Sequence, residues 1–592
     1  MTFPSKYATL LCGGITYLLL FLLLSTALAT DESVGNRMAK VFYFQQLLPW
    51  LTVACIPLVW LRPFRFSKLD AAVTLYAGYL LLNFYLSDSP ATTHLHLLGL
   101  LVIAYFLFRS LTTFAPHEFT LAALLSVGAI EALWGLAQLY GLLPSLHGQF
   151  RLTGSFFNPG PYAGFLAILF PLALHQALTS GHSLFRILSG LVTGLLLVAL
   201  PATLSRGAWL AALGGSAVVL NAHFRFSHRL RRYIHSQRFR SAGILLVLLL
   251  LFAGLALGSY HLKRDSADGR WLIWKVSSSL IATHPLTGVG FGHFPGAYGE
   301  AQAAYFSTGN ASPQETLVAD APETAFNEWI QITTEYGFLG LFLFLLVVYG
   351  AFRSAFHIPR QIGLVSSLTA YLIFACFSYP FNVLPLLLLF LLLLAQSVAR
   401  STPPISGYWP SKLLYPLLLF LAVHLTADRS RHQEAYRRWK SEQTYFNMQI
   451  FERTVDHYRH LYPLLHDQPA FLFEYGQCLS RTSQPDSSNH ILIQAARLSA
   501  DPMIWNIMGK NHQLLKQYTA AEAAFREAAA RVPNRLYPLY LLAKMYAEKG
   551  DTAQAIATAR LVIHKTPKIP SPATREMKQE MQLLVQQLEN TP

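Results

Sequence analysis

The chain has 592 residues, of which 53% are hydrophobic and 13% charged, and 45 Lys and Arg against 30 Asp and Glu give a formal net charge of +15. A soluble globular protein carries about a quarter charged residues, so the composition excludes a wholly soluble protein. The length also exceeds that of one domain, about 250 residues. In so apolar a chain the basic excess indicates cytoplasmic loops and anionic lipid rather than nucleic acid. The four cysteines show no Cys-x-x-Cys spacing, so neither a metal site nor a disulfide framework is predicted.

Apolar runs of membrane-spanning length follow one another from the N-terminus to about residue 426. They predict an all-α fold that begins with a polytopic membrane helix bundle of about 12–13 spans. This membrane domain covers residues 1–426 and contains one long non-cytoplasmic loop at 261–327. Spans are expected near 8–29, 41–61, 69–86, 92–114, 119–141, 161–178, 184–203, 207–223, 241–260, 328–352, 360–378, 383–399 and 411–426.

The orientation follows from Lys and Arg in the short loops, which gather on the cytoplasmic side. Basic loops occur at 62–68, from Arg109 onward, and at 222–240. All three fall on one side if every span is real, which places loop 261–327 on the export side. An odd number of spans then exports the tail as well. Five basic residues directly after residue 426 oppose that placement, and one missed or false span would leave the tail in the cytoplasm.

After residue 426 the sequence changes to alternating charged and apolar helix formers with a 34-residue repeat, which predicts a helical tetratricopeptide-type solenoid over 427–592. Small residues at fixed positions let two antiparallel helices touch. Such arrays often bind a protein partner on their concave face, and many only stabilise their host. The matching positions are Trp505, Gly509, Ala521, Phe525, Ala528 and Pro533, then Leu539, Ala543, Tyr546, Ala555, Ala559 and Pro567, preceded by a degenerate unit with Tyr475, Gly476, Ala496 and Pro502.

Three arginines stand beside helix ends on the export side, where the charge rule disfavours them: Arg151, Arg206 and Arg270. An arginine at the membrane boundary costs several kcal/mol unless it meets an anion, and its planar fork suits phosphate oxygens. A lipid-linked phosphate or pyrophosphate is the anion available at that depth. The alternative is that these side chains snorkel to headgroups or pair with an internal carboxylate.

Four motifs together resemble the O-antigen ligase and polymerase superfamily. They are Arg-Leu-Thr-Gly-Ser-Phe-Phe-Asn-Pro (151–159), Thr-Leu-Ser-Arg-Gly-Ala (203–208), an Arg-x-x-x-Trp segment leading to Leu-Ile-x-x-His-Pro-Leu-x-Gly-Val-Gly-x-Gly (270–292), and Phe-Asn-Glu-x-x-Gln-x-x-x-Glu-Tyr-Gly-x-x-Gly (326–340). The resemblance spans roughly residues 140–400. With its tetratricopeptide tail, the chain is similar to ligase-type members from Gram-negative bacteria.

The resemblance implies a multi-pass glycosyltransferase of the bacterial inner membrane that needs no metal or cofactor. It would transfer a glycan from undecaprenyl pyrophosphate to an acceptor hydroxyl at the periplasmic face. By motif position, Arg206 and Arg270 correspond to the pyrophosphate-binding arginines, with Arg151 as a third candidate. The family usually has a histidine directly before the asparagine of the last motif, where this chain has Phe326. We therefore take Glu323, His293 and Asn327 as the candidate catalytic residues.

Several substrates fit this reading. The acceptor is lipid A core in a ligase, Ser or Thr of an exported protein in an O-oligosaccharyltransferase, and the growing glycan in a polymerase. A periplasmic repeat domain favours a protein partner, whereas transfer to lipopolysaccharide is the family default. A non-catalytic transporter of lipid-linked glycan is the alternative from another class, and it predicts charged residues along the midplane of several helices.

Overall fold

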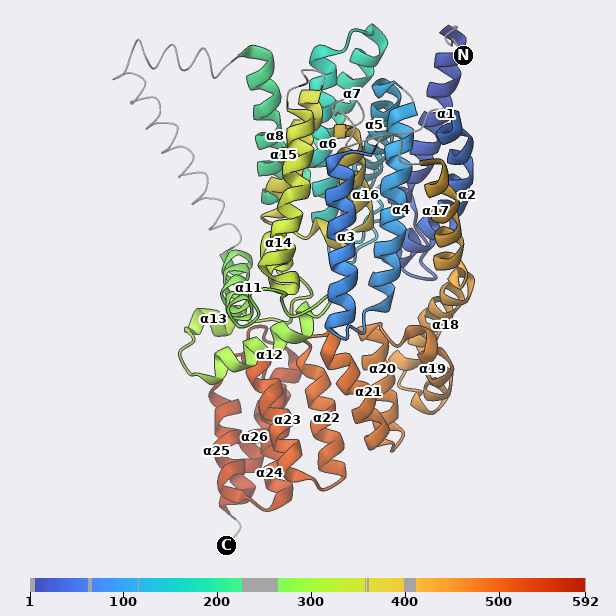
Figure 1. Cartoon of the computed structure of the whole chain (residues 1–592). Helices are drawn as coiled ribbons and strands as arrows, with labels where there is room; N and C mark the ends of the chain where they lie inside the picture. The colour runs from blue at the N-terminus through green and yellow to red at the C-terminus, as the bar shows by residue number, and fades with distance from the viewer. Residues whose placement is uncertain are drawn as a thin grey trace, which may run out of the picture.

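The computed structural model describes residues 6–61, 66–114, 116–225, 264–356, 358, 361–398 and 411–590. Every regular element in these ranges is a helix, which confirms the predicted all-α class. Figure 1 shows an upright helix bundle with a second group of helices at one end; α1 begins at the opposite end, and the C-terminus lies at the tip of the second group.

Nine helices in the described ranges are long and apolar enough to cross a membrane, so the chain is a multi-pass membrane protein. Shorter apolar helices complete the bundle, and the expected span at 241–260 lies outside the described residues. The nine are α1 (Lys6–Leu24, continued by the 3-10 turn Ser25–Leu28), α2 (Asn36–Leu61), α3 (Lys68–Leu86), α4 (Thr92–Phe114), α5 (His117–Leu139), α6 (Pro159–Thr179), α7 (Ser183–Ala202), α8 (Arg206–Phe224) and α14 (Glu328–Ala355). The shorter ones are α15 (Ile362–Ala375), α16 (Leu384–Val398) and α17 (Ser411–Thr426), with a 3-10 turn at Pro380–Asn382.

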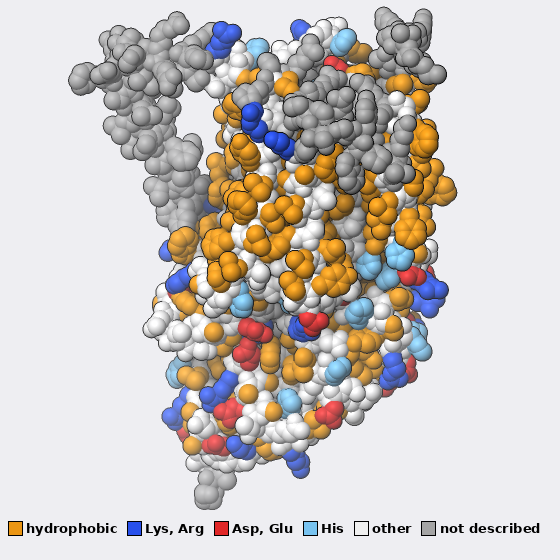
Figure 2. Space-filling view, in the orientation of Figure 1, with side chains coloured by type: hydrophobic (Ala, Val, Ile, Leu, Met, Phe, Trp, Pro, Cys, Tyr) orange, Lys and Arg blue, Asp and Glu red, His pale blue; other side chains and the backbone are white. Residues whose placement is uncertain are grey.

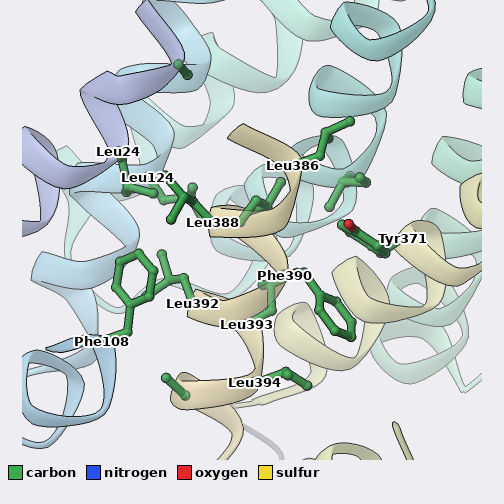
Figure 3. Close-up of a cluster of buried hydrophobic side chains, with 14 of the residues drawn as sticks. Leu24, Phe108, Leu124, Tyr371, Leu386, Leu388, Phe390, Leu392, Leu393 and Leu394 are labelled. Atoms are coloured by element: carbon green, nitrogen blue, oxygen red, sulfur yellow. The ribbon is translucent and has the colours of Figure 1, made fainter. Parts of the chain in front are cut away.

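Helix α16 forms the centre of the bundle. Nearly all of its side chains are buried, as expected of a helix that is apolar on every side and surrounded by other helices. In Figure 3, Leu388 and Leu392 lie toward Leu124 and Phe108, while Phe390 lies toward Tyr371. The rings of Tyr371 and Phe390 are 4.8 Å apart. A helix enclosed in this way can be shorter than a lipid-facing span because its ends meet protein.

The exposed side chains divide the molecule in the same way as the helices do. Figure 2 shows hydrophobic side chains in a band over the bundle and most of the charged side chains below it, over the second group of helices. A band of this kind is typical of a surface in contact with lipid.

Arg109, which we expected in a cytoplasmic basic loop, instead lies buried within α4, where its Nε donates to Asp70 Oδ1 at 2.7 Å.

Helix α14 is broken at Gly337, whose backbone (φ 66°, ψ −173°) is a conformation that essentially only glycine adopts. The glycine-rich loop 284–292 packs into this break. Its Val289 N–H donates to the Thr334 carbonyl at 2.8 Å, and its Gly290 N–H donates to the Glu335 carbonyl at 3.0 Å. These two N–H donors are therefore used to hold α14.

Helices α18–α26, called the repeat array below, form antiparallel pairs as the 34-residue period predicts. The close contacts use the small residues of the pattern: a Cβ on Gly509 would lie 2.5 Å from the Phe525 ring, and one on Gly476 would lie 2.6 Å from Leu492. Sequence reasoning missed the first pair, α18 and α19. The helices are α18 (Arg429–Asn447), α19 (Phe451–Leu465), α20 (Pro469–Arg481), α21 (Pro485–Leu498), α22 (Pro502–Leu514), α23 (Tyr518–Arg531), α24 (Tyr537–Lys549), α25 (Thr552–His564) and α26 (Pro572–Glu589).

Three helices between α8 and α14 connect the bundle to the repeat array: α11 (Arg264–Thr283), α12 (Phe294–Ser307) and α13 (Pro313–Val318). They lie at the end of the bundle where the array is (Figure 1). Gly296 and Gly299 of α12 sit directly against α21 and α23, because a Cβ at either position would lie within 2.5 Å of Arg497 or Arg531.

The array is fixed on this side by hydrogen bonds from one of its side chains to backbone carbonyl groups. Asn534 Nδ2 donates to the backbone carbonyls of Thr316, Leu317 and Ala319, the last at 2.7 Å. Asn534 is buried, so these three acceptors would lose their partner if the array moved away. The loop after α13 therefore has a defined position relative to the array.

Candidate functional site

Two of the predicted arginines meet at the end of the bundle that faces the array. Arg270 extends from α11, and its Nη1 donates to the Phe377 carbonyl at 2.9 Å. Arg206 is the first residue of α8, and the following Gly207 packs on the Phe377 side chain, 3.1 Å from where a Cβ would be. Burial and the nearby charge of Arg206 lower the pKa of Arg270. The charges of Arg206 and Arg270 are thus close enough to interact, and no carboxylate among the described residues hydrogen-bonds to Arg270.

The start of α8 adds backbone donors beside these side chains. Helix N-termini leave N–H groups without intrahelical partners and carry a partial positive charge, which makes them suited to anions. The Ser205 hydroxyl makes no capping hydrogen bond to α8, and the preceding Leu204 has a left-handed backbone (φ 51°) that turns the chain sharply into the helix. The bare Ser-Arg-Gly turn thus presents a helix N-terminus together with Arg206.

Phe326, which stands where the family has histidine, lies against Arg270. Its ring centre is 5.3 Å from the Arg270 guanidinium carbon, a cation–π arrangement, and its ring meets Tyr379 edge-on at 5.3 Å. Phe326 has φ 52°, the left-handed region that side chains rarely adopt. Burial raises the pKa of Tyr379 to about 12, so its hydroxyl keeps its proton at neutral pH.

A cavity of about 530 Å³ opens beside Arg270. Its volume is within the range of small-molecule sites, about 300–1,000 Å³. The walls come from α2, the loop before α6, α11–α13, the segment after α13, the loop after α15 and the last loop of the array. Among the residues that line it are Arg37, Arg270, Glu323, Phe326, Tyr379 and Lys568. Arg206 lies beside Arg270 but is not part of this wall.

Glu323 lies at the cavity, as a candidate base should. Its side chain is 83% exposed, and Oε2 is 3.7 Å from Nη1 of Arg37. An exposed pair at this distance contributes little to stability, about 0–1 kcal/mol. The Glu323 carboxylate is therefore accessible to a substrate hydroxyl.

His293 does not line the cavity. It precedes α12, next to the turn that ends α3 and close to Arg497 of the array. Burial and the charge of Arg497 lower its pKa. The buried Nδ1 has no hydrogen-bond partner among the described residues. The structure thus separates His293 from Glu323, the two residues that we considered as substitutes for the missing histidine.

Asn327 is occupied as the N-cap of α14. Its Oδ1 accepts from the backbone N–H of Trp329 at 3.0 Å and of Ile330 at 3.2 Å. We expect Asn327→Ala to lower the free energy of unfolding by about 1 kcal/mol, while Asn327→Ser, which keeps a cap, retains both stability and glycan transfer. Thermal unfolding and a transfer assay on both variants check this. Loss of transfer in a stable Asn327→Ser protein would instead indicate a catalytic role.

Arg151 is exposed and does not line the cavity. The motif that it begins anchors the loop before α6. Gln138 Oε1 accepts from the Gly154 N–H at 2.8 Å, and the Glu131 carboxylate accepts from the Ser155 N–H at 3.1 Å. The motif's buried polar groups are thus accounted for by loop anchoring.

Sequence reasoning did not single out most of the cavity wall, including Arg37, Tyr379 and Lys568. Arg37 lies between the first two predicted spans, in a segment that the predicted topology places on the export side, so the rule that selected Arg206 would also have selected Arg37. Tyr379 and Lys568 carry no such signal, because each reaches the cavity from a separate part of the fold.

One comparison with known proteins gives a family match within the membrane domain. Residues 191–345 match the family model described as O-antigen ligase, Wzy_C. These residues carry an O-antigen ligase domain. The O-antigen ligase match extends from α7 into α14, so it contains Arg206, Arg270, Glu323 and Phe326, and it confirms the resemblance found in the motifs. It supports a membrane glycosyl transfer of the O-antigen ligase or polymerase type.

The other two comparisons add little to the O-antigen ligase match. A search of curated proteins finds no match. Among solved structures, the chain is similar to one in the crystal structure of the APC/C hetero-tetramer Cut9–Hcn1, with 12% identity and a TM-score of 0.22 over 92% of this chain and 90% of that one. A TM-score this low carries no argument about fold or function.

Proposed function

We propose that the protein is an O-antigen ligase-like glycosyltransferase of the bacterial inner membrane. It takes a glycan from undecaprenyl pyrophosphate and transfers it to an acceptor hydroxyl, by default on lipid A core, at the periplasmic face. Residues 1–426 form the catalytic membrane domain in this proposal, and residues 427–592 form a periplasmic repeat domain. The proximity of Arg206 and Arg270 at one end of the bundle, within the ligase match, is the observation that carries the proposal.

The chemistry needs an anion site and a base. The acceptor hydroxyl attacks the anomeric carbon, the bond to the pyrophosphate oxygen breaks, and negative charge grows on the leaving pyrophosphate. Arg206, Arg270 and the start of α8 would stabilise that charge more strongly in the transition state than in the bound donor. Glu323 would take the proton of the acceptor hydroxyl.

The transporter alternative would need charged groups free to line a path through the bundle. Two of the buried charged groups that would have to line it are held by protein instead: Glu131 accepts from the Ser155 N–H, and Asp70 is paired with Arg109. These contacts favour a structural role for both groups, so we retain glycosyl transfer.

The proposal is tested with the full chain in proteoliposomes that contain an undecaprenyl-pyrophosphate-linked glycan. Lipid A core, an exported acceptor protein and free glycan are supplied in turn. Transfer to lipid A core supports the default, transfer to protein identifies an O-oligosaccharyltransferase, and longer glycan chains identify a polymerase. Consumption of no donor with any acceptor would refute glycosyl transfer.

We expect Glu323→Gln to lower the rate of transfer by about 10²–10⁴-fold, the usual contribution of a general base. Folding should be unaffected, because the side chain is exposed and loses only a weak pair with Arg37. Steady-state transfer rates at saturating donor, with thermal unfolding as the control, check this. A Glu323→Gln protein with the wild-type rate would exclude this base, and His293→Gln is measured beside it to test the other candidate.

A further inference from the structure

Lys568 reaches the cavity from the repeat array. It lies in the loop between α25 and α26, is exposed, and forms no ion pair with any residue that the structure describes. The other cations at the cavity are engaged: Arg37 pairs with Glu323, and Arg270 contacts a carbonyl and the Phe326 ring. No ion pair within the described residues therefore explains the position of the Lys568 ammonium group.

The rest of the wall has the chemistry of a saccharide site. The rings of Phe157, Phe326 and Tyr379 line it, and the fully buried Tyr298 lies behind its wall. Aromatic faces carry partial negative charge and attract the partly positive C–H groups of a sugar ring. Carboxylates and an amide then provide the acceptors that hydroxyl groups need. These polar lining residues are Asp265, Asp320, Glu323 and Asn382.

Lys568 reaches the cavity from a different part of the fold than the arginines of the proposed pyrophosphate site. Arg206 begins α8 of the bundle and Arg270 lies on α11, whereas Lys568 lies between α25 and α26 of the array; Figure 1 shows where these helices lie. The array is held against this region through Asn534 and α12, so its loops have fixed places at the cavity. A substrate in the cavity can therefore contact Arg270 on α11 and Lys568 of the array together.

We propose that the cavity binds an anionic saccharide of one of the substrates, and that Lys568 of the repeat array contacts its acidic group. This rests on the proposed glycosyl transfer for its biological meaning. It assigns the array a direct part in substrate binding, in addition to any partner that its concave face recognises. The acidic group is a phosphate or carboxylate carried by the sugar.

The test measures binding to the full-length chain in detergent micelles by tryptophan fluorescence, because Trp271 and Trp274 lie on α11 beside the cavity. The probes are glucose 6-phosphate, glucuronate, uncharged glucose and inorganic phosphate. Lys568→Glu is compared with Lys568→Arg and with the matched control Lys549→Glu, an exposed lysine in the neighbouring helix α24.

We expect Lys568→Glu to weaken binding of the two anionic sugars by about tenfold or more and to leave glucose unchanged, since only a charge-assisted contact is lost. Lys568→Arg and Lys549→Glu should bind as the wild type does. Inorganic phosphate should bind more weakly than glucose 6-phosphate, because it lacks the ring that packs on the aromatic wall. Equal affinities for glucose 6-phosphate in wild type and Lys568→Glu would overturn the proposal, and so would phosphate binding as tightly as the sugar phosphate.

Transfer kinetics identify the substrate that carries the group. A raised KM for the lipid-linked donor in Lys568→Glu assigns the saccharide to the donor, and a raised KM for the acceptor assigns it to the acceptor. If Lys568-dependent sugar binding is found but no preparation transfers glycan, the proposed function fails while this site remains. Normal KM values for both substrates, together with unchanged sugar binding, would remove the site and leave the function intact.

Discussion

Replacing Arg206 or Arg270 with alanine is expected to lower glycan transfer by about a hundredfold or more, equivalent to roughly 3 kcal/mol of transition-state stabilisation. Each guanidinium would face charge that develops on the leaving pyrophosphate, so the loss should appear mainly in kcat rather than in KM for the donor. The measurement is steady-state transfer by purified variants in proteoliposomes at saturating lipid-linked donor.

Arg264→Ala is the matched control. Arg264 lies on α11 like Arg270 but is 60% exposed and paired with Asp268 one turn away, so its removal should change neither rate nor stability appreciably. Thermal unfolding of all three variants separates lost catalysis from lost folding. Rates within a fewfold of wild type for both Arg206→Ala and Arg270→Ala would exclude the proposed anion site.

The double variant provides a sharper test of proximity. Two groups that act on one anion should show non-additive losses, whereas distant independent groups should add in free energy. Arg270 and Gly207, the residue directly after Arg206, contact the same residue, Phe377, from two elements far apart in the chain. We therefore expect the double variant to lose clearly less than the sum of the two single losses.

The general fold could be predicted because hydrophobic length and repeat period are local properties of the sequence. The apolar runs predicted α1–α8 and the 34-residue period predicted the later array pairs. The first pair was missed because α18 and α19 carry none of the small-residue signature. Arg109 was misplaced since its charge suggested a loop, while its partner Asp70 lies on another helix and could not be recognised from spacing.

The candidate site was predicted only in part, for the same reason. Arg206 and Arg270 could be predicted because each is a basic residue on the predicted export side, where the positive-inside rule disfavours arginine. The separation of His293 from Glu323, and the use of Asn327 as a cap, depend on how loops fold back on α14. Such long-range contacts leave no periodic trace in a single sequence, and Lys568, about 300 residues from Arg270 along the chain, is the extreme example.

The glycine-rich motif links fold and site through α14. Its residues hold the broken helix, and the same loop joins α11, which carries Arg270, to α12, which contacts the array. The motif therefore fixes Arg270 and the array relative to one helix. A substitution in this contact should then affect both stability and transfer, although it touches neither Arg206 nor the cavity.

Gly337→Ala is the second change for which we expect a large effect. The residue has φ 66° and ψ −173°, and a Cβ would lie 2.1 Å from the Leu286 carbonyl oxygen, so a methyl group is excluded by both backbone and neighbour. Strain of this kind costs about 1–3 kcal/mol and overpacking about as much again. We expect a loss of about 3 kcal/mol or more in unfolding free energy, visible as a lower thermal midpoint and a smaller folded fraction in detergent.

Gly288→Ala tests the other side of the same contact, since its Cβ would lie 2.3 Å from the Glu335 carbonyl carbon at φ 70°. It should resemble Gly337→Ala, and the two losses should not add, because either one already opens the contact. Gly194→Ala in α7 is the control: nothing lies within 4 Å of its Cβ position, so helix propensity alone predicts a gain of up to about 1 kcal/mol. If Gly337→Ala unfolds at the same temperature as Gly194→Ala, the loop does not lock α14, and the position of Arg270 must be set by its contacts with Phe377 and Phe326 instead.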